Sequence, residues 1–392
     1  MSNNTMRQLS PDYAGFEQGP IRPPSEAASL LIRVTRNCPW NRCVFCTVYK
    51  GQRFSLRSVD DVLEDIARVR GCVDALHAMA EQDGRLTLAA ARRQIADAGD
   101  VASDRAALSA AWHWLAAGAE SIFIQDADSL IIKPERILTI LRFLQESFPW
   151  VRRVTSYARS HTVARMTLDD LKAMREAGLS RIHIGMESGS DRLLALVKKG
   201  VSQEEHIRAG RLVKEAGIEL SEYIMPGLGG KELSREHALE SAAALNAINP
   251  DFIRLRTFAM PADPELFRQN WPQGFTPLND EEMAGELALF VDALNGITSH
   301  LKSDHILNLF EDMDGVFPRD KERLVAMPKA FLALPDEERL LYRVGRRLGV
   351  FAGLADLHDA ARVGRVRAYS QEAGITAANI DYFSREIIRR FI

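Results

Sequence analysis

This chain has little cysteine, no long apolar run and no excess of charge of either sign. Four cysteines in 392 residues, three of them within nine residues, exclude a disulfide framework. No apolar run reaches the roughly 18 residues that a membrane-spanning helix needs. The polar N-terminal segment, MSNNTMRQLSPDYAGFEQGP, lacks the apolar core of a secretory signal. We therefore expect a cytoplasmic protein without a membrane partner, whose thiols stay reduced.

The charge balance gives no sign of a nucleic-acid-binding protein. The formal net charge is -3 and the isoelectric point is near 6.3, so any basic surface is local. The basic stretch Arg385–Arg390 is interpreted as an ordinary helix face. With 26% charged and 46% apolar residues, the composition is that of a soluble enzyme.

The three bunched cysteines form the run Cys38-Pro-Trp-Asn-Arg-Cys43-Val-Phe-Cys46. A C-x4-C-x2-C loop offers three thiolates to one inorganic centre and leaves a fourth ligand position open. A closed structural zinc site takes four protein ligands, and no histidine or cysteine follows at short ligand spacing. A [4Fe–4S] cluster held by three thiolates keeps one iron free for a further ligand. Iron–sulfur ligation is therefore favoured over a zinc knuckle.

Strands and helices alternate along the middle of the chain. Segments near residues 30–35, 121–125, 153–157, 181–185, 219–225 and 252–256 are predicted to be strands. Helices are predicted between them, with caps at Ser58, Thr167 and Ser202 and with Pro134 as a first residue. Six strand–helix steps predict a parallel sheet, and they are too few for a closed eight-stranded barrel. The fold class is therefore α/β, with a partial barrel or an open sheet.

Two segments interrupt this alternation. Residues 71–118 predict a helical insertion, and the chain after about Pro277 is predicted to be helical to its end. We therefore divide the chain into an N-terminal arm (1–29), a core (30–275) and a helical C-terminal region (276–392). Each helical segment either shapes a substrate site or simply covers the sheet.

The cysteine loop and the strand–helix steps after it resemble the radical S-adenosylmethionine (radical SAM) superfamily. Within the superfamily, the sequence most resembles the branch of Elp3-like, methylthiotransferase and HemN-like enzymes. Three segments carry this resemblance: Glu176-Ala-Gly-Leu-Ser-Arg-Ile-His-Ile-Gly-Met-Glu-Ser-Gly-Ser-Asp191, Lys214-Glu-Ala-Gly-Ile218 and Met225-Pro-Gly-Leu-Gly-Gly230. The usual spacing in the superfamily is C-x3-C-x2-C. The extra residue between Cys38 and Cys43 indicates a distinct subfamily.

The resemblance implies that the sheet forms a partial (βα)6 TIM-like barrel. It also implies a [4Fe–4S] cluster on Cys38, Cys43 and Cys46, with SAM chelated to its free iron. One electron from the reduced cluster would cleave SAM, usually giving methionine and a radical that abstracts hydrogen from substrate. It also implies an oxygen-sensitive enzyme and an electron donor such as flavodoxin or ferredoxin. The oligomeric state is left open.

Residues at the ends of the predicted strands are the candidates for SAM contacts. Each has a simpler alternative, such as a hydrophobic plug for Phe45, an acidic approach to a helix for the aspartates, or surface charge for Arg159. The resemblance assigns Phe45 to the adenine region, a carboxylate to the ammonium group, Arg159 to the SAM carboxylate and Glu187 with Ser188 to the ribose or amino group. The complete cofactor-binding set is Phe45, Asp126, Asp128, Arg159, Glu187 and Ser188.

No catalytic residue is assigned firmly. Weak candidates are Tyr157 after the third strand, His305 in Ser303-Asp-His305, and Arg254 with Arg256, which alternate along the sixth strand. Alternation puts both arginines on one face, either toward the barrel interior or toward solvent.

The sequence predicts a radical SAM enzyme that abstracts hydrogen from an unknown, small substrate. One cysteine remains beyond the three, so a second cluster held by cysteines is excluded. Two alternatives stay open. One is aminocarboxypropyl transfer after cleavage of another sulfur–carbon bond of SAM, and the other is a non-catalytic iron–sulfur or zinc protein.

Overall fold

A computed structural model describes residues 7–83, 102–261 and 263–389. Eight strands form one mostly parallel sheet with the order β1-β4-β5-β6-β7-β8-β9-β10, and β2 (Thr35–Arg36) pairs with β3 (Ser55–Leu56) in a separate ribbon. The strands of the main sheet are β1 (Leu30–Arg33), β4 (Ser121–Gln125), β5 (Arg153–Ala158), β6 (Leu179–Glu187), β7 (Glu219–Ile224), β8 (Phe252–Leu255), β9 (His300–Lys302) and β10 (Asp314–Val316). The first six occupy the predicted positions, which confirms the α/β fold class.

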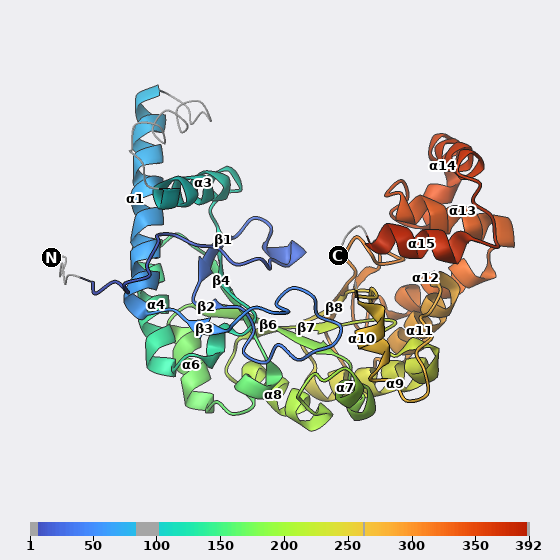
Figure 1. Ribbon diagram of the computed structural model, residues 1–392, viewed down its shortest axis with the longest axis horizontal. Coiled ribbons are helices and arrows are strands. Elements are labelled where there is room, and N and C mark those ends of the chain that lie inside the picture. Colours follow the sequence, from blue (N-terminus) through green and yellow to red (C-terminus); the bar gives the residue numbers. More distant parts are fainter. Residues whose placement is uncertain (1–6, 84–101, 262, 390–392) are drawn as a thin grey trace. The chain divides into compact units, whose positions relative to one another are not determined.

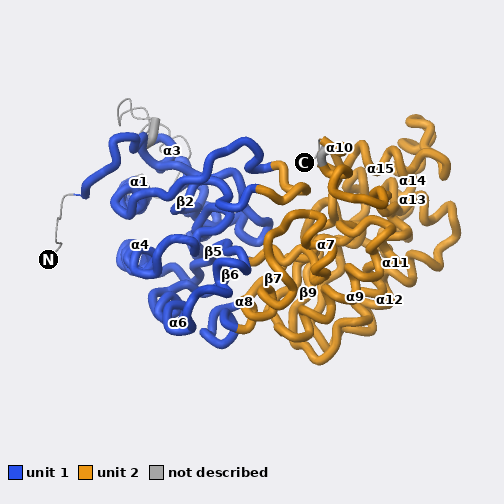
Figure 2. Tube along the Cα trace, turned by 60° about the horizontal axis from the view of Figure 1, so that its bottom comes forward, with its two compact units in different colours: residues 1–41, 48–183, 212–219 blue, residues 42–47, 184–211, 220–392 orange. Residues whose placement is uncertain are grey.

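The chain divides into two compact units, shown in Figure 2. Unit 1 comprises residues 1–41, 48–183 and 212–219, and unit 2 comprises residues 42–47, 184–211 and 220–392. The C-x4-C-x2-C loop contributes to both, because Cys38 belongs to unit 1 and Cys43 and Cys46 belong to unit 2.

Unit 1 is built on the parallel pairing of β1 with β4 and of β4 with β5. Its helices include α1 (Val59–Asp83), α3 (Ala102–Ala116), α4 (Pro134–Ser147), α5 (Ser160–Val163) and α6 (Leu168–Glu176). The long helix α1 packs against α3 and α4, and Figure 1 shows α3 beside it. Its stripe at 3.6-residue spacing, Val62, Ile66, Val69, Val73 and Leu76, is fully buried and joins these helices.

Unit 2 holds β7, β8 and β9 in parallel, with β10 antiparallel at the edge. Its helices are α7 (Asp191–Leu196), most of α8 (Gln203–Glu215), α9 (Gly230–Ile248), α10 (Pro264–Arg268), α11 (Asp280–Ala293), α12 (Lys321–Ala333), α13 (Asp336–Arg347), α14 (Ala360–Glu372) and α15 (Ile380–Arg389). Helix α11 packs against both α9 and α12, and α13 packs against α14 and α15.

The predicted helix starts are confirmed by their caps. The Ser58 hydroxyl accepts from the Asp61 N–H, and Thr167 accepts from the Asp170 N–H. At Ser202 the capping box closes in both directions with Glu205. Helix α4 begins at Pro134, as the sequence indicates.

The prediction of a helical C-terminal region is wrong in one respect. Strands β9 and β10 lie within it and extend the sheet beyond β8. Each has only three residues, too few to show a period-two pattern, so the pairing with β8 is what makes β9 a strand. In the helical insertion, α1 and α3 are helical as predicted, and residues 84–101 lie outside the described part of the chain. No described helix is both long enough and apolar enough to cross a membrane.

Candidate functional site

In unit 1, the first half of the cysteine loop is shaped by two asparagines. Asn37 and Asn41 have φ angles of 68° and 43°, the left-handed region that asparagine tolerates better than most residues. The Asn41 N–H lies 3.4 Å from Cys38 Sγ, and the Asn37 side chain donates to the Arg53 carbonyl at 2.7 Å. The loop is therefore fixed around Cys38 by its own backbone turns.

Asp126 lies behind this loop and is 1% exposed. Its Oδ2 accepts from Arg33 Nη2 at 2.8 Å and from the Asn37 N–H at 3.1 Å, and the Tyr49 hydroxyl donates to Oδ1. A Cβ on Gly19 would lie 3.0 Å from the carboxylate, so the N-terminal arm passes close to Asp126 and a larger residue there would push against it. These contacts give Asp126 a role in holding the loop, and its assignment to SAM stays a prediction.

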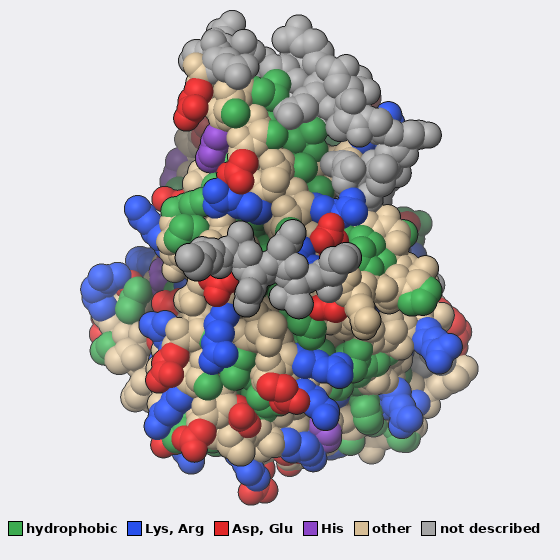
Figure 3. Space-filling model, turned by 90° about the vertical axis from the view of Figure 1, so that its left-hand side faces the viewer, with side chains coloured by type: hydrophobic (Ala, Val, Ile, Leu, Met, Phe, Trp, Pro, Cys, Tyr) green, Lys and Arg blue, Asp and Glu red, His purple; other side chains and the backbone are tan. Residues whose placement is uncertain are grey.

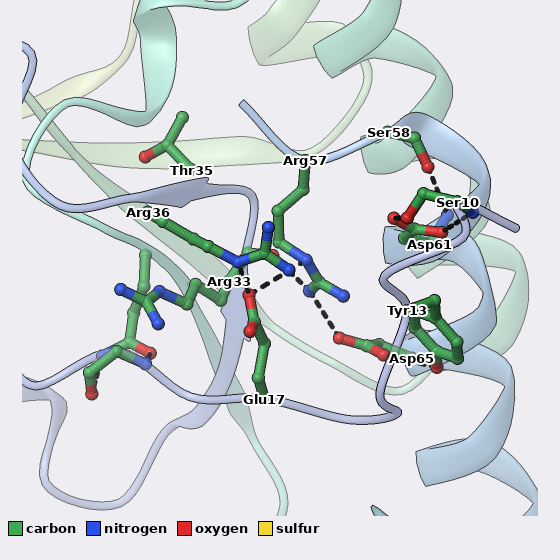
Figure 4. Close-up of polar contacts among 12 residues, drawn as sticks. Ser10, Tyr13, Glu17, Arg33, Thr35, Arg36, Arg57, Ser58, Asp61 and Asp65 are labelled. Atoms are coloured by element: carbon green, nitrogen blue, oxygen red, sulfur yellow. Dashed lines mark hydrogen bonds and ion pairs between the residues drawn. The ribbon is translucent and has the colours of Figure 1, made fainter. Parts of the chain in front are cut away.

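Ion pairs and a hydrogen bond, shown in Figure 4, hold the N-terminal arm to the rest of unit 1. Glu17 Oε1 bridges Arg36 Nε at 2.8 Å and Arg57 Nε at 3.1 Å. Arg57 also binds Asp65 at 2.6 Å, and Tyr13 donates to Asp65 at 2.8 Å. Because Arg36 directly precedes the loop, the arm supports the approach to Cys38.

Asp128 and Arg159 lie at neighbouring strand ends in unit 1. Asp128 accepts from the Arg159 N–H at 3.1 Å and from the Thr162 hydroxyl at 2.6 Å. Burial raises the pKa of Asp128 to about 6, although these donors and the Arg159 charge favour its ionised form. The Arg159 guanidinium lies 5.1 Å from the centre of the Trp40 ring, within the cysteine loop. The structure thus brings two predicted cofactor residues together beside the loop.

Tyr157, a weak catalytic candidate, belongs to an aromatic group in unit 1. Its ring lies 5.1 Å from Phe123 and 5.7 Å from His183, edge-on and tilted. His183 Nε2 lies 3.1 Å from Glu26 Oε1, and both side chains are fully buried. These contacts give Tyr157 a packing role, and a catalytic role stays a prediction.

In unit 2, the second half of the cysteine loop is a tight turn. The Cys46 N–H donates to the Cys43 carbonyl at 3.3 Å, and the Val44 N–H donates to the Val197 carbonyl at 3.0 Å. The Phe45 ring lies 5.7 Å from Lys199 Nζ. Phe45 also packs on an apolar cluster that includes Met225 and Leu228. The residues after α7 therefore position Cys43 and Cys46.

Lys199, which contacts the Phe45 ring, also forms an ion pair with Glu187, with 3.0 Å between Lys199 Nζ and Glu187 Oε1. Glu187 ends β6 with a φ of 65°. Such an angle is uncommon for a residue other than glycine, and residues that adopt it cluster at functional sites. Its carbonyl accepts from the Met225 N–H at 3.0 Å, so it also fixes the start of the Met225–Gly230 turn. A predicted SAM residue is thus held next to the Phe45 turn.

Glu222 on β7 is a buried carboxyl that sequence reasoning missed. It is 0% exposed, and neither carboxyl oxygen has a hydrogen-bond partner among the described residues. Burial raises its pKa well above the ordinary range, with Lys199 opposing and Glu187 reinforcing the shift. A buried, unsatisfied carboxyl is costly, and such groups concentrate where function requires them.

Replacing Glu222 with leucine is expected to stabilise the fold by about 1–3 kcal/mol at neutral pH, since it removes an unsatisfied buried polar group. The folded state keeps this proton while an unfolded glutamate loses it near a pKa of about 4.3. Wild-type stability should therefore fall as pH rises above that value, relative to Glu222→Leu. Urea unfolding from pH 4 to 8 measures this. The exposed Glu215→Leu is the control, and parallel curves for Glu222→Leu and wild type would contradict the assignment.

Ser188, another predicted cofactor residue, is engaged by a histidine from α9. Its Oγ lies 2.9 Å from His237 Nδ1, and His237 Nε2 lies 3.1 Å from the Met225 carbonyl. Because a carbonyl only accepts, Nε2 carries the proton and Nδ1 accepts from the serine. Burial lowers the pKa of His237 to about 4, so the ring is neutral near pH 7. His237 ties the segment around Glu187 to the Met225–Gly230 turn.

Glu286 on α11 fixes the same turn from the other side. It accepts from the Gly227 N–H at 2.7 Å and from the Ser234 hydroxyl at 2.6 Å. Burial raises the pKa of Glu286 to about 7. Gly227 has a φ of 84°, and a Cβ there would lie 2.4 Å from Met283 Cε. The sequence does not indicate this contact, because Glu286 and Gly227 are 59 residues apart.

The remaining weak candidates also lie in unit 2. Arg254 is 3% exposed, pairs with Asp304 and donates to Ser221 Oγ at 3.1 Å. Arg256 lies one residue past the end of β8 and is exposed. Burial, followed by the charge of Arg256, lowers the pKa of His305 to about 4. Arg254 therefore has a structural partner, and the catalytic roles of all three stay predictions.

The three cysteines suit an iron–sulfur cluster by their chemistry. All three are partly exposed and none forms a disulfide, and thiolate is the usual protein ligand of such clusters. Within residues 7–83, 102–261 and 263–389, no three His, Cys, Asp or Glu side chains are gathered for a metal ion. The fit therefore rests on the donor set and its sequence spacing.

Comparison with known proteins supports the same conclusion. Residues 32–242, more than half of the chain, match the family model of the radical SAM superfamily. The tRNA uridine(34) acetyltransferases of Methanocaldococcus infernus and Methanocaldococcus jannaschii are 28% and 24% identical over 115 residues. That stretch spans 29% of this chain and only 21% of either relative.

Among solved structures, the similar ones include an archaeal Elp3 and a radical SAM methyltransferase. Elp3 of Methanocaldococcus infernus has a TM-score of 0.38 and 19% identity, covering 47% of this chain and 48% of that one. The methyltransferase TsrM of Kitasatospora setae has a TM-score of 0.44 and 13% identity, covering 77% and 61%. Scores this low carry no argument about function, so the family assignment rests on the sequence match. The chain belongs to the radical SAM superfamily, whose enzymes use a [4Fe–4S] cluster and SAM.

Proposed function

We propose that this chain cleaves SAM reductively at a [4Fe–4S] cluster held by Cys38, Cys43 and Cys46, and starts hydrogen abstraction from a small substrate. The observation that carries the proposal is the three-thiol loop directly after β1 and β2, within a region that matches the radical SAM family. When bound, the cluster supplies the electron that breaks a sulfur–carbon bond of SAM.

The protein's own groups bind and orient the cofactor. Asp126 holds the first half of the loop, and Lys199 and Val197 hold the second half. Glu187 is a carboxylate suited to hydroxyl or ammonium donors, and Arg159 offers a guanidinium to a carboxylate. His237 and Glu286 fix the Met225–Gly230 turn, whose backbone would line the adenine region.

A small substrate is favoured over nucleic acid. The net charge is -3, and the face in Figure 3 carries basic and acidic side chains interspersed, without a continuous basic stripe. The likeness to tRNA-modifying relatives covers about a fifth of their length and does not by itself extend their substrate to this chain. We also propose a cytoplasmic, oxygen-sensitive protein that receives electrons from a flavodoxin or ferredoxin.

Product analysis tests the proposal. Anaerobically reconstituted protein, incubated with SAM and dithionite, is expected to release 5′-deoxyadenosine and methionine in equal amounts, measured by liquid chromatography and mass spectrometry. Methylthioadenosine instead would show aminocarboxypropyl transfer. If reconstituted protein shows a [4Fe–4S] signal that SAM does not perturb, and no SAM is consumed, the proposed function fails.

A further inference from the structure

Unit 2 contains a cavity of about 330 Å³ next to the Met225–Gly230 turn. Gly227 lies in its wall, together with the segment that follows β8, helix α10, the start of α11 and helix α15. Small-molecule sites in proteins typically occupy roughly 300–1,000 Å³. The cavity is therefore of suitable size for a small ligand, and it borders a turn that the proposed function gives to the cofactor.

The lining of the cavity is basic. Its charged residues are Arg268, Arg347, Arg385, Arg389 and Asp280. The negative charge of Asp280 is already balanced, because this carboxylate pairs with Arg347 and lies 3.0 Å from Arg343 Nε. Burial alone would raise the pKa of Asp280, but these two arginines lower it to about 2. The other arginines thus face the cavity without a buried counter-charge.

These other arginines are free to bind an incoming anion. Arg268 pairs with Glu265 at 3.1 Å and Arg389 with Glu386 at 2.8 Å, each within its own helix and at the surface. Exposed pairs of this kind are weak and easily exchanged. Arg385 has no carboxylate partner among the described residues of the chain. Three guanidinium groups from α10 and α15 are thereby available on one cavity.

We propose that this cavity binds a small molecule carrying a carboxylate or phosphate, held by Arg268, Arg385 and Arg389, and that this molecule is the substrate. Guanidinium groups bind both anions with paired N–H donors. The apolar part of the ligand would lie on Phe258, Met260 and Met283, which line the same cavity. Its identity as substrate rests on the proposed function, whereas anion binding does not.

Calorimetry with the reconstituted full chain tests anion binding without reductant, so that no SAM is cleaved. Inorganic phosphate and succinate serve as the two probes, and they separate a phosphate ligand from a carboxylate one. We expect saturable binding of at least one probe, weakened about tenfold or more in Arg385→Ala and in Arg268→Ala. Both positions are exposed, so the variants should remain folded, which circular dichroism checks. Arg367→Ala, exposed on α14 and outside the cavity, is the control.

Three results would overturn the inference: binding of neither probe, affinity unchanged in both cavity variants, or an equal loss in Arg367→Ala. A tRNA transcript that binds tightly and loses affinity in the same cavity variants would replace the small ligand with RNA. The proposed function is judged separately. If anion binding passes this test but SAM is not cleaved, the proposed function fails and the anion site stands.

Discussion

Replacing any one of Cys38, Cys43 and Cys46 with serine is expected to abolish SAM cleavage. A [4Fe–4S] cluster held by three thiolates has no spare protein ligand, so one substitution removes a third of its anchorage. Bound iron should fall from about four atoms per chain toward zero, together with the broad absorbance of the cluster. Iron analysis after anaerobic reconstitution and measurement of 5′-deoxyadenosine check both effects.

Cys72→Ser is the matched control, because Cys72 is the fourth cysteine, forms no disulfide and lies on α1, away from the loop in sequence. It should retain iron and activity. The chain should remain folded in all four variants, since the loop cysteines are partly exposed and form no disulfide. A loop variant that still holds four iron atoms and cleaves SAM would remove that cysteine from the ligand set.

Asp126→Asn is expected to destabilise unit 1 by about 3 kcal/mol, because it removes one partner of a buried ion pair. The Asp126 side chain is fully buried and that of Arg33 is 13% exposed, so the arginine would lose its counter-charge in a poorly solvated place. The variant should also reconstitute its cluster poorly, since Asp126 binds the Asn37 N–H beside Cys38. Urea unfolding measures the first effect and iron content the second.

A graded series separates this positioning role from direct SAM binding. Tyr49→Phe removes one donor to Asp126 and should cost about 1 kcal/mol, whereas the exposed Asp169→Asn should change stability by less than about 0.5 kcal/mol. If Asp126→Asn instead weakens SAM binding at unchanged stability, the carboxylate contacts the cofactor, as the resemblance implies.

The strands and helix starts of the core follow from local sequence. Pro134, Thr167 and Ser202 act on backbone groups within one turn, so their effect is visible without the fold. The short strands β9 and β10 are different. In the sheet, β9 pairs with β8 and with β10, and nothing in three residues indicates this pairing.

The residues that support the site could not be predicted either, because they contact it from distant parts of the sequence. His237 reaches Ser188 across 49 residues, and Glu286 reaches Gly227 across 59. Glu222 has an ordinary place in a strand pattern, and its altered pKa arises only because the surrounding chain buries it. Burial and long-range contact are properties of the packed chain, which periodicity cannot report.

The sequence by itself determined the family and the α/β class, and it proposes the three thiol ligands, because each depends on residue type and short spacing. The tertiary structure alone decided that Asp126 anchors the loop and that the turn around Gly227 is held by His237 and Glu286. It also decided that arginines from α10 and α15 share one cavity, although more than a hundred residues separate Arg268 from Arg385. Such groupings depend on how distant segments pack, and that is settled by burial and electrostatics across the whole chain.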